Sequence, residues 1–186
     1  MKKIDLINHF LIAMPGMGDP FFSSSVVYIC RHDDQGALGV VLNKRSDLTL
    51  DDLLVSAGLH PVVVDGGHDT ILCGGPVESN CGFVIHSFNK KWRSTLKVTE
   101  DIALTTSLDI LEEINAGSCE DDTLISVGCS GWVSGQLEDE ITRNYWLSVP
   151  AQPAILFETP IDRRFDAALA LLGLTSDKLS LGGGRA

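Results

Sequence analysis

The stretch SSVVYICRHDDQGALGVVLN, residues 24–43, contains two apolar runs on either side of a polar turn, DDQG at 33–36. The first run is rich in β-branched and aromatic residues, which favour extended strands. Both runs are nearly continuously apolar, and strands of this kind are covered on both faces of their sheet. The pattern therefore predicts a β-hairpin, 24–32 and 37–43, in a sheet that has no wet face.

Further strands and helices are predicted on both sides of this hairpin. Apolar runs bounded by Gly and Pro indicate strands at 10–14, 71–75, 83–88, 123–132 and 154–157. Residues 89–106 are expected to form a hairpin at the edge of the sheet. Four helices are predicted, at 50–58, 107–117, 134–146 and 160–173.

Two of these helices carry recognisable start signals. Thr49 can accept a hydrogen bond from the backbone N–H of Asp52, which would satisfy one of the free donors of the first turn. Thr106 and Asp109 have the spacing of a capping box. A glycine follows each of the two helices, where a left-handed residue would end it.

The order of the elements indicates the fold class. Hairpins outnumber β-α-β units, so a strongly curved mixed sheet flanked by about four helices accounts for the order better than a doubly wound parallel sheet. No internal repeat or low-complexity linker divides the chain. We predict an α/β fold of α+β-like character that forms a single domain over residues 1–186, in which 174–186 is a flexible tail.

Charge and composition disfavour several classes of function. The chain has 14 Lys and Arg against 25 Asp and Glu, a formal net charge of −11. A phosphate backbone would meet repulsion, so binding to nucleic acid is not expected. No stretch approaches the roughly 20 apolar residues of a membrane-spanning helix, and the apolar run within residues 1–17 is too short for a signal peptide. No membrane partner is expected.

The five cysteines are odd in number and widely spaced. They show neither a C-x-x-C pair nor a Cys/His grouping at zinc-ligand spacing. We expect reduced thiols in a cytoplasmic protein, with no metal site and no cofactor.

Several short blocks occur together and in order. They are FLIAMPGMGDPFF at 10–22, LGVVLNKR at 38–45, GGPVE at 74–78, GFVIHS at 82–87, GCSGWVSGQLEDEI at 128–141 and NYWL at 144–147. This ordered set resembles the YqgE/AlgH family of bacterial proteins over most of residues 8–186. The resemblance implies a compact α/β domain whose sheet forms a bifurcated pseudo-barrel.

The resemblance says less about activity. One branch of the family is named for the regulation of alginate synthesis, but this sequence shows no helix-turn-helix and no basic recognition helix. Cys129 also departs from the family pattern, in which this position is usually aromatic. A catalytic role for its thiol would therefore not be a family property, and we interpret Cys129 as a packed side chain.

The GGPV block at 74–77 is one candidate for ligand binding. The backbone N–H groups of Gly74 and Gly75 beside Pro76 could surround an anion, because glycines are free to adopt positive φ. The block lacks the Lys and Ser/Thr of a P-loop. A tight turn between strands is the alternative, and we favour it.

The second candidate region follows the 123–132 strand, in the SGQLE segment at 134–138. Gln136 and Glu138 lie there at the start of a helix, where acidic side chains also favour the positive end of the dipole. The chemical hypothesis is that His86 and Glu138 form an acid-base pair and share one cleft with Glu78. The structural alternative is a solvated helix face.

Three classes of function remain open. We favour a non-catalytic regulatory or protein-interaction module with an unknown protein partner, because no complete catalytic set can be assembled. The alternative is an enzyme that binds a small molecule or anion through the GGPV and SGQLE loops. A third possibility, a transcriptional regulator that binds DNA directly, is disfavoured by charge. A homo-oligomer that pairs the edge around 95–105 also remains open.

Overall fold

The structure is a computed structural model that describes residues 5–62, 70–119 and 122–182. Its nine strands are β1 (His9–Ala13), β2 (Val26–Asp33), β3 (Gly36–Val41), β4 (Leu72–Cys73), β5 (Val77–Ser87), β6 (Thr95–Lys97), β7 (Ile102–Thr105), β8 (Thr123–Val133) and β9 (Trp146–Pro150). The α-helices are α1 (Leu50–Ser56), α2 (Leu108–Asn115), α3 (Gln136–Thr142), α4 (Pro153–Phe157), α5 (Arg164–Ala170) and α6 (Ser176–Gly182). Two 3₁₀ helices, η1 (Pro20–Phe22) and η2 (Ile161–Arg163), complete these ranges.

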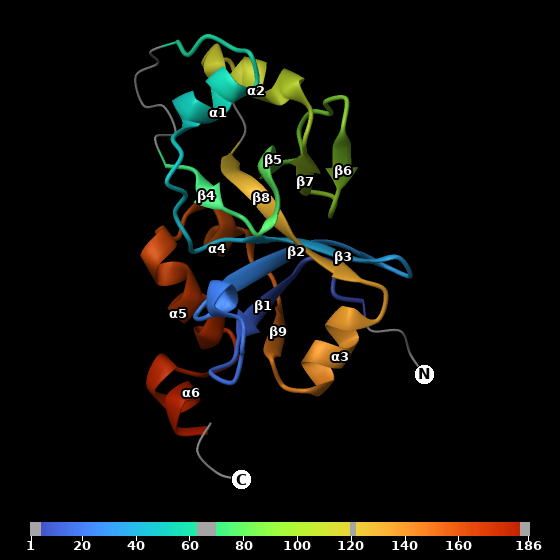
Figure 1. Ribbon diagram of the computed structural model, residues 1–186, viewed down its shortest axis with the longest axis vertical. Coiled ribbons are helices and arrows are strands. Elements are labelled where there is room, and N and C mark those ends of the chain that lie inside the picture. The colour runs from blue at the N-terminus through green and yellow to red at the C-terminus, as the bar shows by residue number, and fades with distance from the viewer. Residues whose placement is uncertain (1–4, 63–69, 120–121, 183–186) are drawn as a thin grey trace.

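The strands form one strongly curved sheet in the order β6-β7-β5-β8-β3-β2-β1-β9. All neighbours in this order are antiparallel, and β4 adds a short parallel pair with β8. The long strand β8 is shared, because its first half pairs with β5 and β4 while its end pairs with β3. The sheet therefore branches at β8, and its strong curvature gives it the shape of a half-barrel, as the resemblance implied (Figure 1).

Three apolar clusters show how the sheet is covered. Alternate residues of β1 and β2 belong to different clusters, because side chains of a strand point to opposite faces. One cluster fills the interior of the half-barrel and includes residues of α4, α5 and α6. A second lies under α3, and the third packs α1 and α2 against β5 and β8. The predicted absence of a wet face is confirmed for the hairpin strands.

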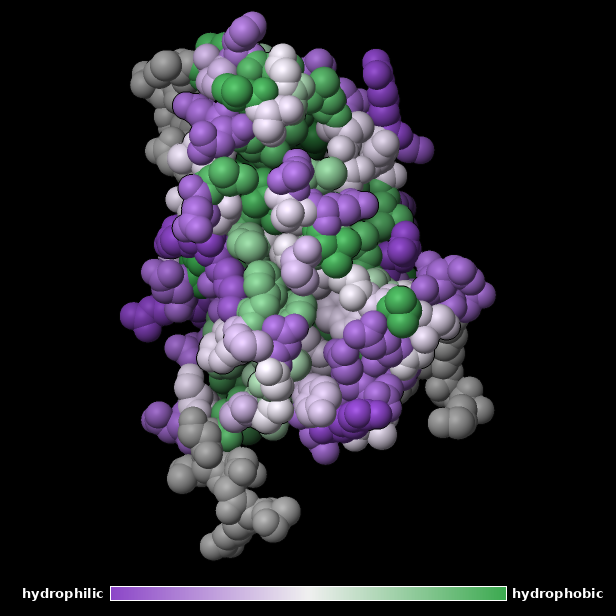
Figure 2. All heavy atoms as spheres, viewed as in Figure 1, coloured by the Kyte–Doolittle hydropathy of each residue, from purple (hydrophilic) through white to green (hydrophobic). Residues whose placement is uncertain are grey.

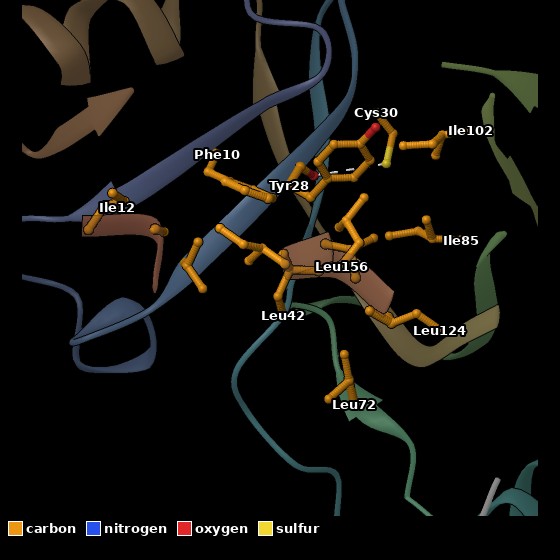
Figure 3. Packing of buried hydrophobic residues seen from close by; sticks show 14 of the residues in the cluster. Phe10, Ile12, Tyr28, Cys30, Leu42, Leu72, Ile85, Ile102, Leu124 and Leu156 are labelled. Carbon is orange, nitrogen blue, oxygen red and sulfur yellow. Dashed lines mark hydrogen bonds between the residues drawn. The ribbon is translucent and has the colours of Figure 1, made fainter. Parts of the chain in front are cut away.

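The interior cluster brings together side chains from distant parts of the chain. Figure 3 shows Tyr28 and Cys30 of β2 near Ile85 of β5, Ile102 of β7 and Leu156 of α4. Each of the five is at most 3% exposed. The core is thus closed by contacts that no local pattern specifies.

Predictions that rest on patterns within a few residues of sequence are confirmed. The predicted hairpin is present, with β2 and β3 paired antiparallel. At α1, Thr49 accepts from the N–H of Asp52, and the Asp52 carboxylate accepts from the N–H of Thr49 at 2.8 Å. The predicted edge hairpin is β6 with β7, and β6 is the edge strand.

One predicted strand and one helix boundary are wrong. Residues 154–157 form helix α4 rather than a strand, because Pro153 occupies the first helical turn and a short apolar run has no diagnostic periodicity. The helix predicted over 134–146 ends at Thr142, since Asn144 adopts a left-handed φ of 59°. Residues from Trp146 onward then form β9, which pairs with β1.

Two further expectations need correction. Ser107 rather than Thr106 is the N-cap of α2, and its side chain binds the Asp109 carboxylate at 2.5 Å instead of closing a capping box. Part of the segment expected to be a flexible tail is helix α6, in which Leu179 is buried in the interior cluster. Residues 183–186 of that expectation lie outside the described ranges. Six α-helices therefore flank the described sheet, where about four were expected.

Candidate functional site

The backbone of the GGPV block is in close contact with the backbone of β8 near the middle of that strand. The N–H of Gly74 donates to Val127 O at 2.9 Å, so it is not free for a ligand. Gly74 O accepts from the N–H of Val41 and from Ser130 Oγ at 3.1 Å. A Cβ at Gly75 would lie 2.1 Å from the Cys129 carbonyl. This geometry supports a structural turn, in which glycine is needed because two backbones touch.

Immediately after this turn, β5 leaves the regular ladder. Val77 pairs with Cys129 and Gly82 pairs with Val127, so the residues between them, 78–81, form a large β-bulge without register partners. Residues 77–81 are all exposed, and Glu78 has a left-handed φ of 49°. Side chains other than Gly, Asn and Asp rarely adopt this conformation, and such residues cluster at functional sites. The bulge is therefore the first candidate surface.

The cysteine beside the bulge is not an activated nucleophile. Cys129 is 3% exposed, and burial followed by the nearby charge of Glu78 raises its thiol pKa to about 11. Catalytic cysteines need the opposite shift, because the thiolate is the reactive form. These findings support its interpretation as a packed side chain.

His86 is fully buried in β5 and uses both ring nitrogens within the protein. Nδ1 lies 2.8 Å from Ser87 O, which can only accept, so Nδ1 carries the proton. Nε2 forms a hydrogen bond with Thr105 Oγ1 at 2.8 Å. The ring also meets Trp92 edge to face, with 4.7 Å between ring centroids. His86 thus joins β5 to β7 in the interior.

Glu138 pairs with a different histidine. Its carboxylate lies 3.0 Å from His32 Nε2, while His32 Nδ1 accepts from the N–H of Leu6 at 3.2 Å. The His32 side chain is only 2% exposed, whereas Glu138 is 37% exposed. The pair therefore fastens α3 and residue 6 to β2, and Nε2–H donates to the carboxylate.

The structure does not bring the proposed acid-base pair together. His86 pairs with Thr123 at the start of β8, whereas Glu138 follows the end of β8. Over the 11 residues of that strand the two ends are on the order of 30 Å apart. Glu78 and His86 also sit near opposite ends of β5. A shared cleft of Glu78, His86 and Glu138 is absent from the described residues, since each belongs to a separate neighbourhood.

Gln136 belongs to a polar network centred on Glu140. Gln136 Nε2 donates to Glu140 Oε1 at 2.9 Å, and the indole N–H groups of Trp132 and Trp146 both donate to Glu140 Oε2 at 2.8 Å. The Trp rings meet each other and Phe22 in one aromatic cluster. Sequence reasoning grouped Glu140 with the charged face of the helix and missed its role as an acceptor, although two buried tryptophans require acceptors for their N–H groups.

The outer face of α3 matches the expected solvated helix face. Figure 2 shows mostly hydrophilic residues around α3, while hydrophobic residues reach the surface over α1 and α2.

Within the described ranges, no group of three or more His, Cys, Asp or Glu side chains could hold a metal ion. In the same ranges, no helix has the length and apolar character needed to cross a membrane.

Fold and site together define a single-domain α/β protein with a curved, largely antiparallel half-barrel. The polar side chains described above, those of His32, His86, Gln136, Glu138 and Glu140, connect its strands and helices. The chain belongs to the AlgH-like family (DUF179), which it matches over residues 10–177. The resemblance inferred from the ordered blocks is thereby confirmed.

Relatives and solved structures agree with this assignment. The chain is 48% identical to a UPF0301 protein of Nitrosospira multiformis and 47% identical to one of Chromobacterium violaceum, with 97% of each chain covered. The solution structure of the AlgH protein from Pseudomonas aeruginosa is 43% identical, with a TM-score of 0.82 over 100% of this chain and 98% of that one. Protein DIP2367 from Corynebacterium diphtheriae, at 20% identity and a TM-score of 0.69 over 91% of this chain and 88% of that one, shares the fold.

Proposed function

We propose that this protein is a non-catalytic regulatory module of the bacterial cytoplasm that acts by binding another protein. The observation that carries the proposal is the bulge of β5, where residues 78–81 are exposed and have no partner in the sheet. An exposed strand segment of this kind offers backbone N–H and C=O groups to a partner strand.

Exposed apolar side chains at the start of β5 and at the end of β8 define the contact surface. Val77 is 43% exposed and Val133 is 71% exposed. Gly131 lies between them, because a Cβ at Gly131 would meet Val77 Cγ2 at 3.8 Å. Gly131 and Val133 share one face of β8, since they are two residues apart. We call Val77, residues 78–81, Gly131 and Val133 the bulge surface.

Charge and cysteine chemistry add to this proposal. The net charge of −11 favours a partner with a basic contact surface. All five cysteines are free thiols, which is typical of a reducing compartment such as the cytoplasm.

The enzymatic alternative finds less support in the same geometry. The polar groups of the SGQLE segment bind Glu140 and His32, and Gly74 N–H binds Val127 O. Direct DNA binding remains disfavoured by charge. Self-association through β6 would rest on an edge strand of only 3 residues, which is short for a stable pairing.

Affinity capture with charge-introducing variants tests the proposal. Val77→Asp and Val133→Asp place a carboxylate on the bulge surface, and the matched control Val55→Asp changes a 62% exposed valine on α1. Each tagged variant is first checked for native circular dichroism. We expect both bulge variants to lower recovery of the same partner by at least about tenfold, because burying a valine contributes about 1.5–3 kcal/mol.

Two outcomes would contradict this function. Recovery of every partner at the wild-type level by Val77→Asp and Val133→Asp would remove the bulge surface from consideration. Equal losses with Val55→Asp would indicate a general charge effect rather than a site. Sedimentation of the purified protein shows whether the partner is a second copy of the chain.

A further inference from the structure

A separate pocket of about 160 Å³ lies between β4, the start of β8, η2 and α5. Its lining residues are Thr70, Leu72, Thr123, Leu124, Ile125, Ile161 and Arg164. One water needs only about 10–15 Å³ on the same measure, and a cavity of about 150 Å³ admits a molecule the size of benzene. The pocket therefore has room for a small organic ligand.

The charged group in this pocket is Arg164, which is only 7% exposed. Its Nη1 donates to Leu42 O at 2.7 Å and its Nε donates to Thr159 O at 3.1 Å. Within the part of the chain that the structure describes, Arg164 forms no ion pair and Nη2 has no hydrogen-bond partner. In the described ranges, the Arg164 guanidinium thus borders the cavity with two backbone carbonyls as its hydrogen-bond partners.

Such an arrangement is costly unless something else compensates for the charge. Burial and the neighbouring charge of Arg45 lower the pKa of Arg164 to about 10, so the group remains protonated at pH 7. Neutral carbonyls offset the lost hydration of a cation only in part. Buried charges are ordinarily paired with an opposite charge, and in the described ranges no carboxylate lies within ion-pair distance of Arg164, since the nearby Asp162 pairs with Arg45.

A second cation strengthens the positive character of the site. Arg45 Nη1 lies 3.5 Å from Thr70 Oγ1, which lines the pocket, and Arg45 Nη2 lies 3.6 Å from the Asp162 carboxylate. Asp162 is 79% exposed at its side chain, so solvent screens that ion pair strongly. Arg164 therefore lines the pocket and Arg45 contacts one of its lining residues, in a protein whose net charge is −11.

We infer that this pocket binds a small ligand through an oxyanion group, a phosphate or a carboxylate, held by Arg164 and Arg45. A guanidinium presents several N–H donors in one plane and forms charge-assisted hydrogen bonds with both kinds of oxyanion. The Thr70 hydroxyl accepts from Arg45, which leaves its proton for the ligand.

The pocket wall indicates what the oxyanion is attached to. Leu72, Leu124 and Ile125 lie on the sheet side and Ile161 lies on η2. These sheet residues are at most 6% exposed and most of the surface that the pocket offers is polar, so the pocket suits a small oxyanion with little apolar body. Leu72 and Leu124 belong to the same apolar cluster as Leu42, whose carbonyl accepts from Arg164 (Figure 3). The pocket is independent of the bulge surface, because it meets the opposite half of β8.

Isothermal titration of the whole protein tests the inference with three probes, namely inorganic phosphate, sulfate and isobutyrate, at constant ionic strength. We expect phosphate or isobutyrate to bind the wild type at millimolar concentration or below. Arg45→Gln should weaken binding about tenfold through the loss of one charge-assisted contact. Ile161→Phe should abolish binding by filling the pocket without changing any charge.

The matched control is Arg163→Gln, which removes an exposed arginine from η2 that does not line the pocket. It should bind within about twofold of the wild type. Arg164→Met should not bind, provided that its circular dichroism is native. If it does not fold, Arg45→Gln and Ile161→Phe decide the matter, because neither side chain donates to Leu42 O.

Each outcome separates the possibilities. Binding of phosphate and sulfate without isobutyrate identifies a phosphate-bearing ligand, and the reverse identifies a carboxylate. No heat from any probe at millimolar concentration would overturn the inference. Wild-type affinity in Ile161→Phe would also overturn it, as would an equal loss in Arg163→Gln and Arg45→Gln, which would show only a general charge effect.

Discussion

The two ends of β8 differ in how the charged groups beside them are satisfied. At the Val133 end, Glu140 accepts from Trp132, Trp146 and Gln136, and Glu138 pairs with His32. At the Thr123 end, Arg164 donates to backbone carbonyls and has no ion-pair partner within the described ranges. The first end is a complete network that holds helix α3 on the sheet. The second leaves a charge without a counter-ion, and such a charge points to a ligand.

Gly75 lies where the two halves of β8 meet, and we expect its substitution to have the largest effect. Gly75→Ala would place a Cβ 2.1 Å from the Cys129 carbonyl, so the two backbones must separate. The free energy of unfolding in urea should fall by about 4 kcal/mol or more.

Gly131→Ala is the matched control on the same strand, because its Cβ would have 3.8 Å to the nearest atom. It should change the free energy of unfolding by less than about 1 kcal/mol. Similar values for the two variants would show that Gly75 is not a point of contact.

The next effect concerns the complete network. Glu140→Leu leaves the indole N–H groups of Trp132 and Trp146 without their acceptor, so unfolding in urea should become easier by about 2–4 kcal/mol. Asp139→Ala is the control, since Asp139 forms only an exposed ion pair with Arg143. Its cost should stay below about 0.5 kcal/mol. A cost for Glu140→Leu as small as that of Asp139→Ala would mean that the network does not hold α3.

The contrast predicts a smaller cost at the other end of β8. Arg164→Met removes two hydrogen bonds to carbonyls but also removes an unpaired buried charge, so the two effects nearly cancel. We expect the free energy of unfolding to remain within about 1 kcal/mol of that of Arg163→Met, in which the arginine is exposed. A loss of about 3 kcal/mol or more would make Arg164 a structural clamp and erase the difference between the two ends.

The smallest effect on stability at neutral pH is expected from the ionisation of the Cys129 thiol, which lies between the two ends of β8. Its thiol pKa of about 11 lies above the ordinary value of 9.0, so the fold favours the protonated form. That contribution to stability is fully present below about pH 9 and is lost as the pH rises through about 11. Iodoacetamide at pH 8 should therefore modify the exposed Cys81 and spare Cys129, as peptide mapping can show.

Glu78→Gln refines this last prediction. Removing the carboxylate removes one cause of the raised pKa, so alkylation of Cys129 at pH 10 should become faster than in the wild type. Asp34→Asn, at an exposed position in the β2–β3 turn, serves as the control. An unchanged rate in Glu78→Gln would mean that burial, with the nearby Cys81, accounts for the raised pKa of Cys129.

Signals within a few residues predicted local structure well. The Thr49 and Asp52 cap is present atom for atom, and the β2–β3 hairpin follows from its own apolar runs and turn. The strand predicted from the apolar run at 154–157 is wrong, because the apolar patterns of a helix and a buried strand cannot be distinguished over so few residues.

The sites depended on partners that no local pattern reveals. Glu138 and His32 are 106 residues apart in the chain, and Arg164 reaches Leu42 over 122 residues. On the sequence alone, His86 was the more attractive partner because it lies in the predicted strand 83–88 near the GGPV block, yet its ring nitrogens contact Thr105 and Ser87. Arg164 gave no signal at all, since a charged residue near a helix start is ordinarily solvated.

The pairing of β1 with β9 has a consequence for synthesis on the ribosome. His9 of β1 lies opposite Pro150 of β9. The ribosome therefore completes β1, β2 and β3 long before it makes β9. Until α3 is made, the β1–β2–β3 sheet has apolar side chains on both faces, because the helices that cover them, α3 to α6, all lie later in the chain. Pairings over such sequence distances are slow to form. The nascent chain is therefore exposed to aggregation late into translation, and a chaperone that shields this three-stranded intermediate would raise the yield of folded protein.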